Sequence, residues 1–330
     1  MRTGLIACAA VFSLLRAVPP APAGDALLEI TTSREAIYTP GDAQIDLSVT
    51  QAARLEGPYR LRVTASAAGQ TIHERTMTLA RGLRTPCELT FPEVRAVTEI
   101  RCRAELFLGE EFLEAVERSI RLWPARRPPE EAPLCQGLWV LDPSGVVQTL
   151  LSESRIPASD AAFQAVRDFS TPRAVVIGER LDPPAIGRIL DRIETTDSNA
   201  VVVLFRQEQW PDSLHISIAQ DQNDPGAVVR ERSGVLLDGL CSRDVLGLVT
   251  GARPVHVARR PGRTIVSFLR DAAASESEVS SYLCVIHEGN HRILCCQLPG
   301  TDSEDPRQMA LFQNLIRFAC QAGDNERTRP

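Results

Sequence analysis

The hydrophobic pattern of this chain changes at residues 124–133, a Pro-rich and charged segment. Before it, apolar and polar residues alternate in short runs, whereas after it apolar residues come in unbroken runs separated by helical patterns. Alternation is typical of strands that bury one face, and unbroken runs are typical of strands buried on both faces. Because Pro-rich charged segments stay extended, we interpret 124–133 as a linker between two domains of different fold class.

Residues 24–123 are predicted to form an all-β domain. Seven short alternating runs occur here, several of them separated by Gly, Pro or Asp. This density of strands fits an immunoglobulin-like sandwich of two sheets. The segment Tyr38–Asp42, followed by an alternating run, resembles the opening of macroglobulin-type and related bacterial immunoglobulin-like domains. That resemblance implies a spacer or adhesion module.

Residues 134–322 are predicted to form an α/β domain with a parallel sheet. The runs 173–178 and 199–205 contain unbroken apolar stretches at 174–177 and 200–205, and helical patterns at 159–169 and 183–195 stand next to them. Strands that alternate with helices favour parallel pairing with helices on the sheet faces. A closing helix is expected from Asp305-Pro306, a typical helix start, and residues 323–330 are expected to form a disordered tail.

Several segments of this second domain, in their order along the chain, resemble the class I glutamine-amidotransferase-like, flavodoxin-type domain found beside bacterial glycoside hydrolases such as β-galactosidases. The segments that carry the resemblance are Ala174–Gly178, Val201–Phe205, Gln207–Pro211, Val235–Leu240, Arg243–Leu246, Cys296–Leu298, Asp305-Pro306 and Asn314-Leu315. The resemblance implies a three-layer α/β fold. It also implies a noncatalytic module that associates with carbohydrate or serves in assembly.

Active amidotransferases of this family carry a nucleophilic cysteine on a sharp strand-to-helix turn flanked by glycines, with a His–Glu pair near the C-terminus. The matching turn here is Arg206–Pro211, which contains no Cys, Ser or Gly. We therefore expect no amidotransfer by that mechanism, and we assign no catalytic residue. The domain is interpreted as a degenerate relative, a pseudoenzyme.

The same turn offers candidate ligand-binding groups instead. Open parallel sheets bind ligands at the carboxyl ends of their strands. Amides and an indole suit a sugar, through hydrogen bonds to hydroxyls and stacking on an apolar face. The candidates are Gln207, Glu208, Gln209, Trp210 and Gln297. The alternative is that Trp210 packs in the core while Glu208 and Gln209 cap the next helix.

His287-Glu288-Gly289-Asn290-His291 matches the HExxH motif of zinc hydrolases. In those enzymes a helix brings both His side chains to one metal, and the Glu activates water. Here the flanking residues are strongly β-type and Gly289-Asn290 is typical of a turn, so we predict a hairpin tip. A zinc-dependent hydrolase using His287, Glu288 and His291 is kept as an alternative, which a hairpin at 282–298 would end. The leading interpretation needs no cofactor.

Residues 1–23 are predicted to be a signal peptide. Arg2 precedes an apolar run, Leu5–Leu15, that is too short for a stable membrane-spanning helix, and Ala21-Pro22-Ala23 has the spacing that signal peptidase cuts. We therefore expect export to the periplasm or the extracellular space, with no transmembrane segment after cleavage. The formal net charge of −6 argues against nonspecific nucleic-acid binding.

The cysteines fit an exported chain. Eight remain after Cys8 is removed with the signal peptide, and an even number permits disulfides. Cys87 and Cys102 lie in neighbouring predicted strands and are the candidate pair. Most of the others lie in apolar patterns and are predicted to be buried thiols.

The leading functional hypothesis is thus a noncatalytic exported binding or assembly module whose partner is carbohydrate or a cell-envelope protein. Besides the zinc hydrolase, a purely structural protein that oligomerises through the α/β domain is the other alternative.

Overall fold

The computed structural model describes residues 13–15, 27–49, 59–79, 84–125, 137–160, 172–195, 200–218, 228–230, 235–271, 278–289, 291–300 and 302–322. The chain divides into two compact units. One comprises residues 18–127 and 304–306, and the other comprises 1–17, 128–303 and 307–330. Most of the predicted linker and signal peptide, and all of the predicted tail, lie outside the described residues.

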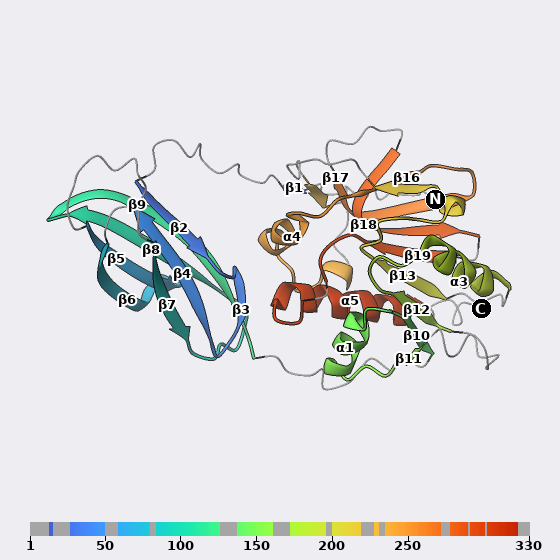
Figure 1. Cartoon of the computed structure of the whole chain (residues 1–330), viewed down its shortest axis with the longest axis horizontal. Helices are drawn as coiled ribbons and strands as arrows, with labels where there is room; N and C mark the ends of the chain where they lie inside the picture. Colours follow the sequence, from blue (N-terminus) through green and yellow to red (C-terminus); the bar gives the residue numbers. More distant parts are fainter. Residues whose placement is uncertain are drawn as a thin grey trace, which may run out of the picture. The chain divides into compact units, whose positions relative to one another are not determined.

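The first unit is a β-sandwich of two sheets (Figure 1). The antiparallel three-stranded sheet has the order β2 (Leu28–Thr32), β4 (Gly41–Val49) and β7 (Arg84–Phe91). The five-stranded sheet has the order β3 (Ala36–Tyr38), β9 (Glu111–Trp123), β8 (Thr98–Leu108), β5 (Tyr59–Ala67) and β6 (Gln70–Leu79). Among the described strands of this unit, β3 and β9 pair in parallel and the other pairs are antiparallel.

Alternation along the strands builds the core of this sandwich. In β4 and β5 every second side chain is buried, and these side chains meet those of β7 and β8 in one apolar cluster. The predicted all-β character is confirmed. The described residues also contain a strand that the sequence did not predict, β3, in which Ala36–Tyr38 pairs with the end of β9 before the chain crosses to the other sheet.

The Tyr38–Asp42 segment forms that crossing. The buried Thr39 donates to the Trp123 carbonyl through its backbone N at 2.9 Å and its Oγ1 at 2.8 Å, and Oγ1 accepts from Val94 N at 3.0 Å. A Cβ on Gly41 would lie 2.5 Å from the Tyr38 carbonyl oxygen, so glycine is required there. The motif therefore marks the crossing between sheets.

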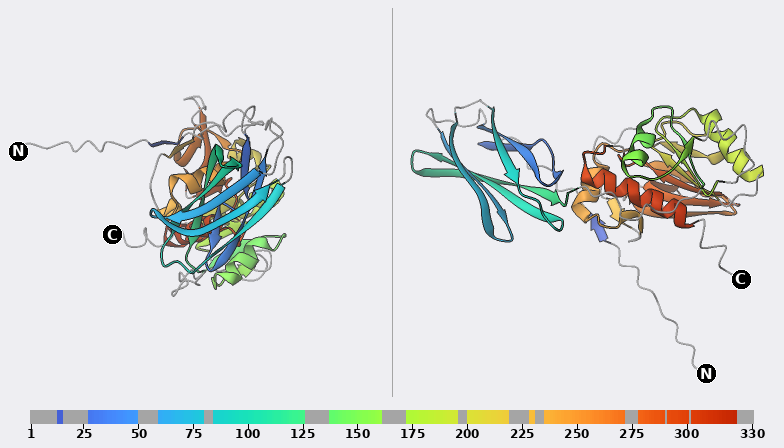
Figure 2. Two further views of the ribbon diagram at one scale, coloured as in Figure 1. Left: turned by 90° about the vertical axis from the view of Figure 1, so that its left-hand side faces the viewer. Right: turned by 90° about the horizontal axis from the view of Figure 1, so that it is seen from below.

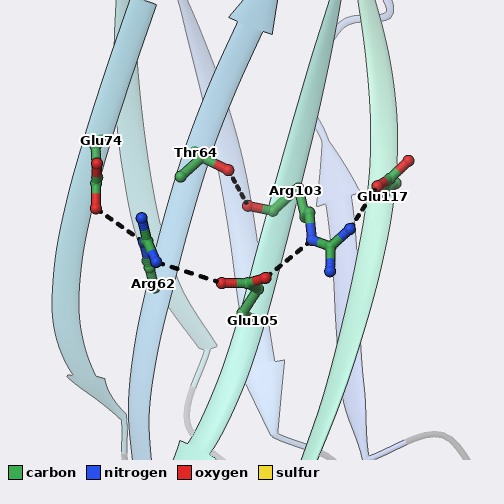
Figure 3. A network of polar contacts seen from close by, with 6 residues as sticks. All are labelled: Arg62, Thr64, Glu74, Arg103, Glu105 and Glu117. Carbon is green, nitrogen blue, oxygen red and sulfur yellow. Dashed lines mark hydrogen bonds and ion pairs between the residues drawn. The ribbon is translucent and has the colours of Figure 1, made fainter. Parts of the chain in front are cut away.

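The outer face of the five-stranded sheet carries a row of ion pairs, which we call the charge ladder (Figure 3). Arg62 Nε lies 2.8 Å from Glu74 Oε1, and Arg62 Nη1 lies 4.0 Å from Glu105 Oε2. Arg103 lies between Glu105 and Glu117: its Nε is 3.0 Å from Glu105 Oε1 and its Nη1 is 3.3 Å from Glu117 Oε1. These five residues link β6, β5, β8 and β9 with alternating charges in solvent.

The second unit is built on one mixed sheet (Figure 1). Five neighbours are parallel: β11 (Ser159–Asp160), β10 (Leu138–Leu141), β12 (Ala174–Ile177), β13 (Val201–Phe205) and β19 (His291–Cys296). The sheet continues antiparallel through β18 (Glu278–Glu288), β17 (Arg263–Asp271), β15 (Val228–Arg230) and β1 (Ser13–Leu15). A side branch runs from β18 to β16 (Val255–Ala258) and β14 (Ile216–Ile218).

Helices cover both faces of this sheet (Figures 1 and 2). On one face, α3 (Pro183–Thr195) buries Ile186 and Leu190 in a cluster with Val202 of β13. On the other, Phe312 of α5 (Pro306–Ala322) stacks on Phe205 with ring centroids 5.9 Å apart. All five β13 side chains are buried, as the unbroken apolar run predicts.

The other helices within the described residues are short. They are α1 (Val146–Glu153), α4 (Ser242–Val249) and the 3-10 turns η1 (Asp212–Leu214) and η2 (Val235–Leu237). Ser159 and Asp160, expected to begin a helix, form β11 instead, and the rest of that expected helix lies outside the described residues. Within the described ranges, no helix is both long and apolar enough to cross a membrane.

Candidate functional site

The parallel strands of the second unit end along one edge of its sheet. The residues that follow β10, β12, β13 and β19 there include Asp142, Gly178, Gln207 and Gln297, and we call these four the strand-end edge. Sheets of this kind bind ligands at this place, and two of the four residues, Gln207 and Gln297, are ligand-binding candidates from the sequence.

Asp142 and Gly178 fill the space between the ends of β10 and β12. The Asp142 side chain is buried, and its Oδ2 accepts from Val147 N at 2.6 Å, at the start of α1. Its Oδ1 accepts from Ser144 Oγ at 2.5 Å. A Cβ on Gly178 would overlap the Asp142 carboxylate, so the backbone and the acid are in direct contact. Sequence reasoning missed Asp142, although an Asp after an apolar strand and before a helix is a recognisable capping signal.

Gln207 is fully buried, and its amide is used within the fold. Oε1 accepts from Leu181 N at 2.8 Å, while Nε2 donates to the carbonyls of Phe205, at 2.6 Å, and Gly178. The side chain thereby ties the loop after β12 to the end of β13. Its polar atoms thus already have backbone partners, and a ligand contact through Gln207 stays a prediction.

Gln297 extends the same arrangement to β19. Its side chain is only 6% exposed, its backbone N donates to the Tyr282 carbonyl at 2.9 Å, and its Nε2 donates to the Gln207 carbonyl at 3.1 Å. The structure shows an amide that joins the ends of two strands, and the expected pocket role of Gln297 stays a prediction. Gln207 and Gln297 together connect β12, β13 and β19.

The other predicted ligand residues separate into buried and exposed groups. Trp210 is 8% exposed and packs in the apolar cluster of α3, the alternative that the sequence left open. Glu208 and Gln209 are exposed, and Glu208 Oε1 lies 3.0 Å from Arg180 Nε in a solvent-facing ion pair. Only these two of the predicted ligand-binding side chains reach the surface.

The turn after β13 is sharp, although no glycine marks it. Arg206 has a φ of 39°, in the left-handed region that non-glycine residues rarely adopt. Its backbone N donates to the Cys296 carbonyl at 2.8 Å, and its Nη1 lies 3.4 Å from Glu179 Oε1. An arginine thus occupies the first position of the turn.

Cys296 is a thiol that ends β19 beside this edge. Its Sγ donates to the Leu298 carbonyl at 3.7 Å, and burial raises the pKa of the thiol to about 12. Because the thiolate is the nucleophilic form of cysteine, this burial disfavours the reactive form of Cys296.

A cavity of about 580 Å³ lies elsewhere in the second unit. It is lined by Arg230, Val235 and residues 237–241, none of which the sequence singled out as ligand-binding. The cavity therefore does not bring together the predicted site residues.

The HExxH segment forms a β-hairpin and not the helix that the zinc alternative requires. In the register of β18 and β19, His287 lies opposite Arg292 and Glu288 lies opposite His291. Consecutive strand residues point to opposite faces of a sheet, so His287 and Glu288 diverge. In the described part of the chain, no group of three or more His, Cys, Asp or Glu side chains is placed to hold a metal.

Both oxygens of Glu288 are already bound by arginines. Arg263 donates to Oε2 from Nε at 3.0 Å and also from Nη2, and Arg260 Nη2 donates to Oε1 at 2.8 Å. The Arg263 side chain is completely buried, and its Nη1 donates to the Leu214 carbonyl at 2.8 Å. Glu288 is therefore placed as the counter-ion of a buried cation and not as a base that activates water.

Cys87, Cys102 and Cys320 differ in oxidation state and in location. Cys87 of β7 and Cys102 of β8 are buried on facing sheets of the sandwich and are not joined, and burial raises the pKa of both. Cys320 of α5, in contrast, forms a disulfide bond. Pairing of Cys87 with Cys102 stays a prediction.

No family model matches the chain, and no curated protein matches it. Among solved structures, the soluble domain of PmoD from Methylocystis is 12% identical, with 29% of this chain and 90% of that chain covered and a TM-score of 0.22.

Two glycosidases are similarly distant. A β-glucuronidase from Parabacteroides merdae is 8% identical (59% of this chain, 23% of that chain, TM-score 0.22). A family 39 glycoside hydrolase from Bacteroides cellulosilyticus is 11% identical (53% and 34%, TM-score 0.23). The chain spans about a third or less of each glycosidase. Likeness at these TM-scores carries no argument about function.

Proposed function

We propose that this chain is a noncatalytic exported module that works by binding or assembly. In this proposal, an immunoglobulin-like sandwich is joined to a degenerate flavodoxin-type, amidotransferase-like domain. The strand order β11-β10-β12-β13-β19 supports the fold, since it corresponds to the order 2-1-3-4-5 of flavodoxin-like sheets. Arg206, with its positive φ, stands at the turn where the resembled enzymes carry their cysteine.

The observation that carries the proposal is the self-contained bonding of the strand-end edge. A catalytic or ligand site needs polar groups that face the substrate and are not already bonded. Here the amide of Gln207 is bonded to three backbone groups, Gln297 is bonded to Gln207, and Asp142 accepts from the backbone N of Val147 in α1. These side chains hold the strands together, which favours recognition through exposed surfaces over chemistry at this edge.

Export is supported by two features. The first 23 residues have the pattern of a signal peptide, and Cys320 is disulfide-bonded, a state that persists mainly in oxidising compartments. Fractionation of cells that express the full gene tests this part. We expect a chain that begins at Gly24 in the periplasmic or extracellular fraction, and an uncleaved chain in the cytosol would contradict it.

The carbohydrate part of the proposal rests on the family resemblance and on exposed Glu208 and Gln209. A glycan array with the mature chain tests it, with the Glu208→Ala/Gln209→Ala double variant compared at equal concentration. Binding that the double variant loses would support a glycan site at this turn. If the mature chain binds no glycan on the array, the proposed carbohydrate binding is wrong.

Assembly is tested by sedimentation velocity over a concentration series. Because the edge offers bonded and buried groups, we expect self-association, or association with a cell-envelope protein, through exposed faces. Turnover of a substrate that stops on Glu208→Gln substitution, or on removal of metal, would overturn the noncatalytic proposal altogether.

A further inference from the structure

Two thiols face each other inside the sheet of the second unit. Cys284 of β18 and Cys295 of β19 are directly opposite in the antiparallel register, and both side chains are fully buried. Opposed residues of antiparallel strands have Cα atoms about 4.5–5.5 Å apart, which lies within the roughly 4.4–6.8 Å that a disulfide spans. The structure holds the two cysteines as separate thiols.

We propose that Cys284 and Cys295 form a cross-strand disulfide when the chain folds in an oxidising compartment, so that this pair is a redox modification site. The inference rests on the proposed export. Two S–H bonds break and one S–S bond forms. An oxidant of the disulfide class, such as oxidised glutathione, accepts the two electrons and two protons through a mixed disulfide and becomes two thiols.

Geometry limits when the bond forms. Opposed Cβ atoms lie about 4.5–5.5 Å apart, whereas a disulfide needs about 3.5–4.5 Å, so the strands must approach slightly at this point. The hydrogen bond with Cys284 and burial raise the pKa of Cys295 well above its usual value, which suppresses the reactive thiolate in the folded state. Oxidation therefore accompanies folding of the hairpin, and the finished bond is shielded from reductants.

Cys296 provides a matched control. It is the next residue of β19, it is equally buried, and it lies opposite Leu283, so its side chain points to the other face of the sheet. If oxidation depended only on nearness in sequence, Cys284 would pair with Cys296 as readily as with Cys295. If the register of the strands determines the bond, Cys284 pairs with Cys295 alone.

The test is a disulfide map of the full chain. The protein is refolded from denaturant with oxidised and reduced glutathione, remaining thiols are alkylated under denaturing conditions, and peptides are analysed by mass spectrometry without reduction. We expect a linked peptide pair containing Cys284 and Cys295. It should be absent from Cys284→Ser and present in Cys296→Ser. Alkylation of both thiols in the wild-type chain, or a bond to Cys296, would overturn the inference, and the wild-type map decides it even where a variant fails to fold.

Failure of the inference and failure of the proposed export give different results. If the chain is found outside the cytosol with Cys284 and Cys295 both alkylated, export holds and the disulfide is wrong. If the bond forms during refolding but the cellular chain is cytosolic and reduced, the site holds and export is wrong.

Discussion

Arg263 donates to the Glu288 carboxylate from two guanidinium nitrogens, Nε at 3.0 Å and Nη2. Glu288 lies at the end of strand β18, and the Arg263 side chain is completely buried. This ion pair occupies the acid of the HExxH sequence with a cation of the fold. The β-type residues on both sides place the motif on a hairpin, and the hairpin turns the acid toward a buried cation.

Glu288→Gln is expected to destabilise the second unit by about 2 kcal/mol, because it leaves the Arg263 charge buried without its counter-ion. Urea denaturation measures the change. Glu208→Gln is the matched control, since its partner Arg180 is exposed and such pairs contribute about 0–1 kcal/mol. Equal stability of the two variants would show that the buried pair has no special role.

Gly178→Ala should destabilise the chain by about 2 kcal/mol or more, because the new methyl group would overlap the Asp142 carboxylate at the strand-end edge. Gly187→Ala in α3 is the comparison, since a Cβ there has open space and alanine favours the helix by about 1 kcal/mol. Thermal melts of both variants give the result. A Gly178→Ala protein as stable as the wild type would mean that this edge is loosely packed.

His287 should make stability fall on mild acidification. Burial first, and then the nearby Arg292 charge, lower the pKa of His287 below its usual 6.5. The unfolded chain therefore binds the proton more readily, and stability is lost as pH falls through about 6.5 toward the folded pKa. Urea midpoints between about pH 5 and 8 should vary less in His287→Gln than in the wild type. An unchanged pH profile would argue against this assignment.

The charge ladder should contribute little and depend on salt. Glu105→Gln removes the acid between Arg62 and Arg103, and we expect a loss of about 0.5–1 kcal/mol in low salt that shrinks near 1 M salt. Glu110→Gln, in the turn between β8 and β9, is the control outside the ladder. A loss that persists in high salt would show that Glu105 acts through packing and not through charge.

Much of the fold could be predicted from local patterns. Alternation in β4 and β5 indicates a half-buried sheet, and the unbroken run in β13 indicates a strand buried on both faces; the structure agrees on both points. Gly289 between β-type flanks is sufficient to predict the hairpin. These features depend only on residues near in sequence.

The site could not be predicted in the same way. An amide in a loop, such as Gln207, looks available to a ligand until its partners are known, and Gly178 and Leu181 lie more than twenty residues earlier in the chain. Arg206 has a left-handed backbone conformation, which the sequence does not indicate because no glycine occupies that position. Burial of Trp210 depends on α3, so the sequence left both possibilities open.

The residues of the strand-end edge bond to one another and to the backbone, and the backbone amide of Leu181 tests this closure most directly. This N–H donates to Gln207 Oε1 at 2.8 Å. Amide hydrogen exchange should show Leu181 protected in the wild-type chain, unprotected in Gln207→Ala, and protected still in Gln209→Ala. Fast exchange of Leu181 in the wild-type chain, slowed only when a ligand is added, would mean that the edge is open and would contradict the account.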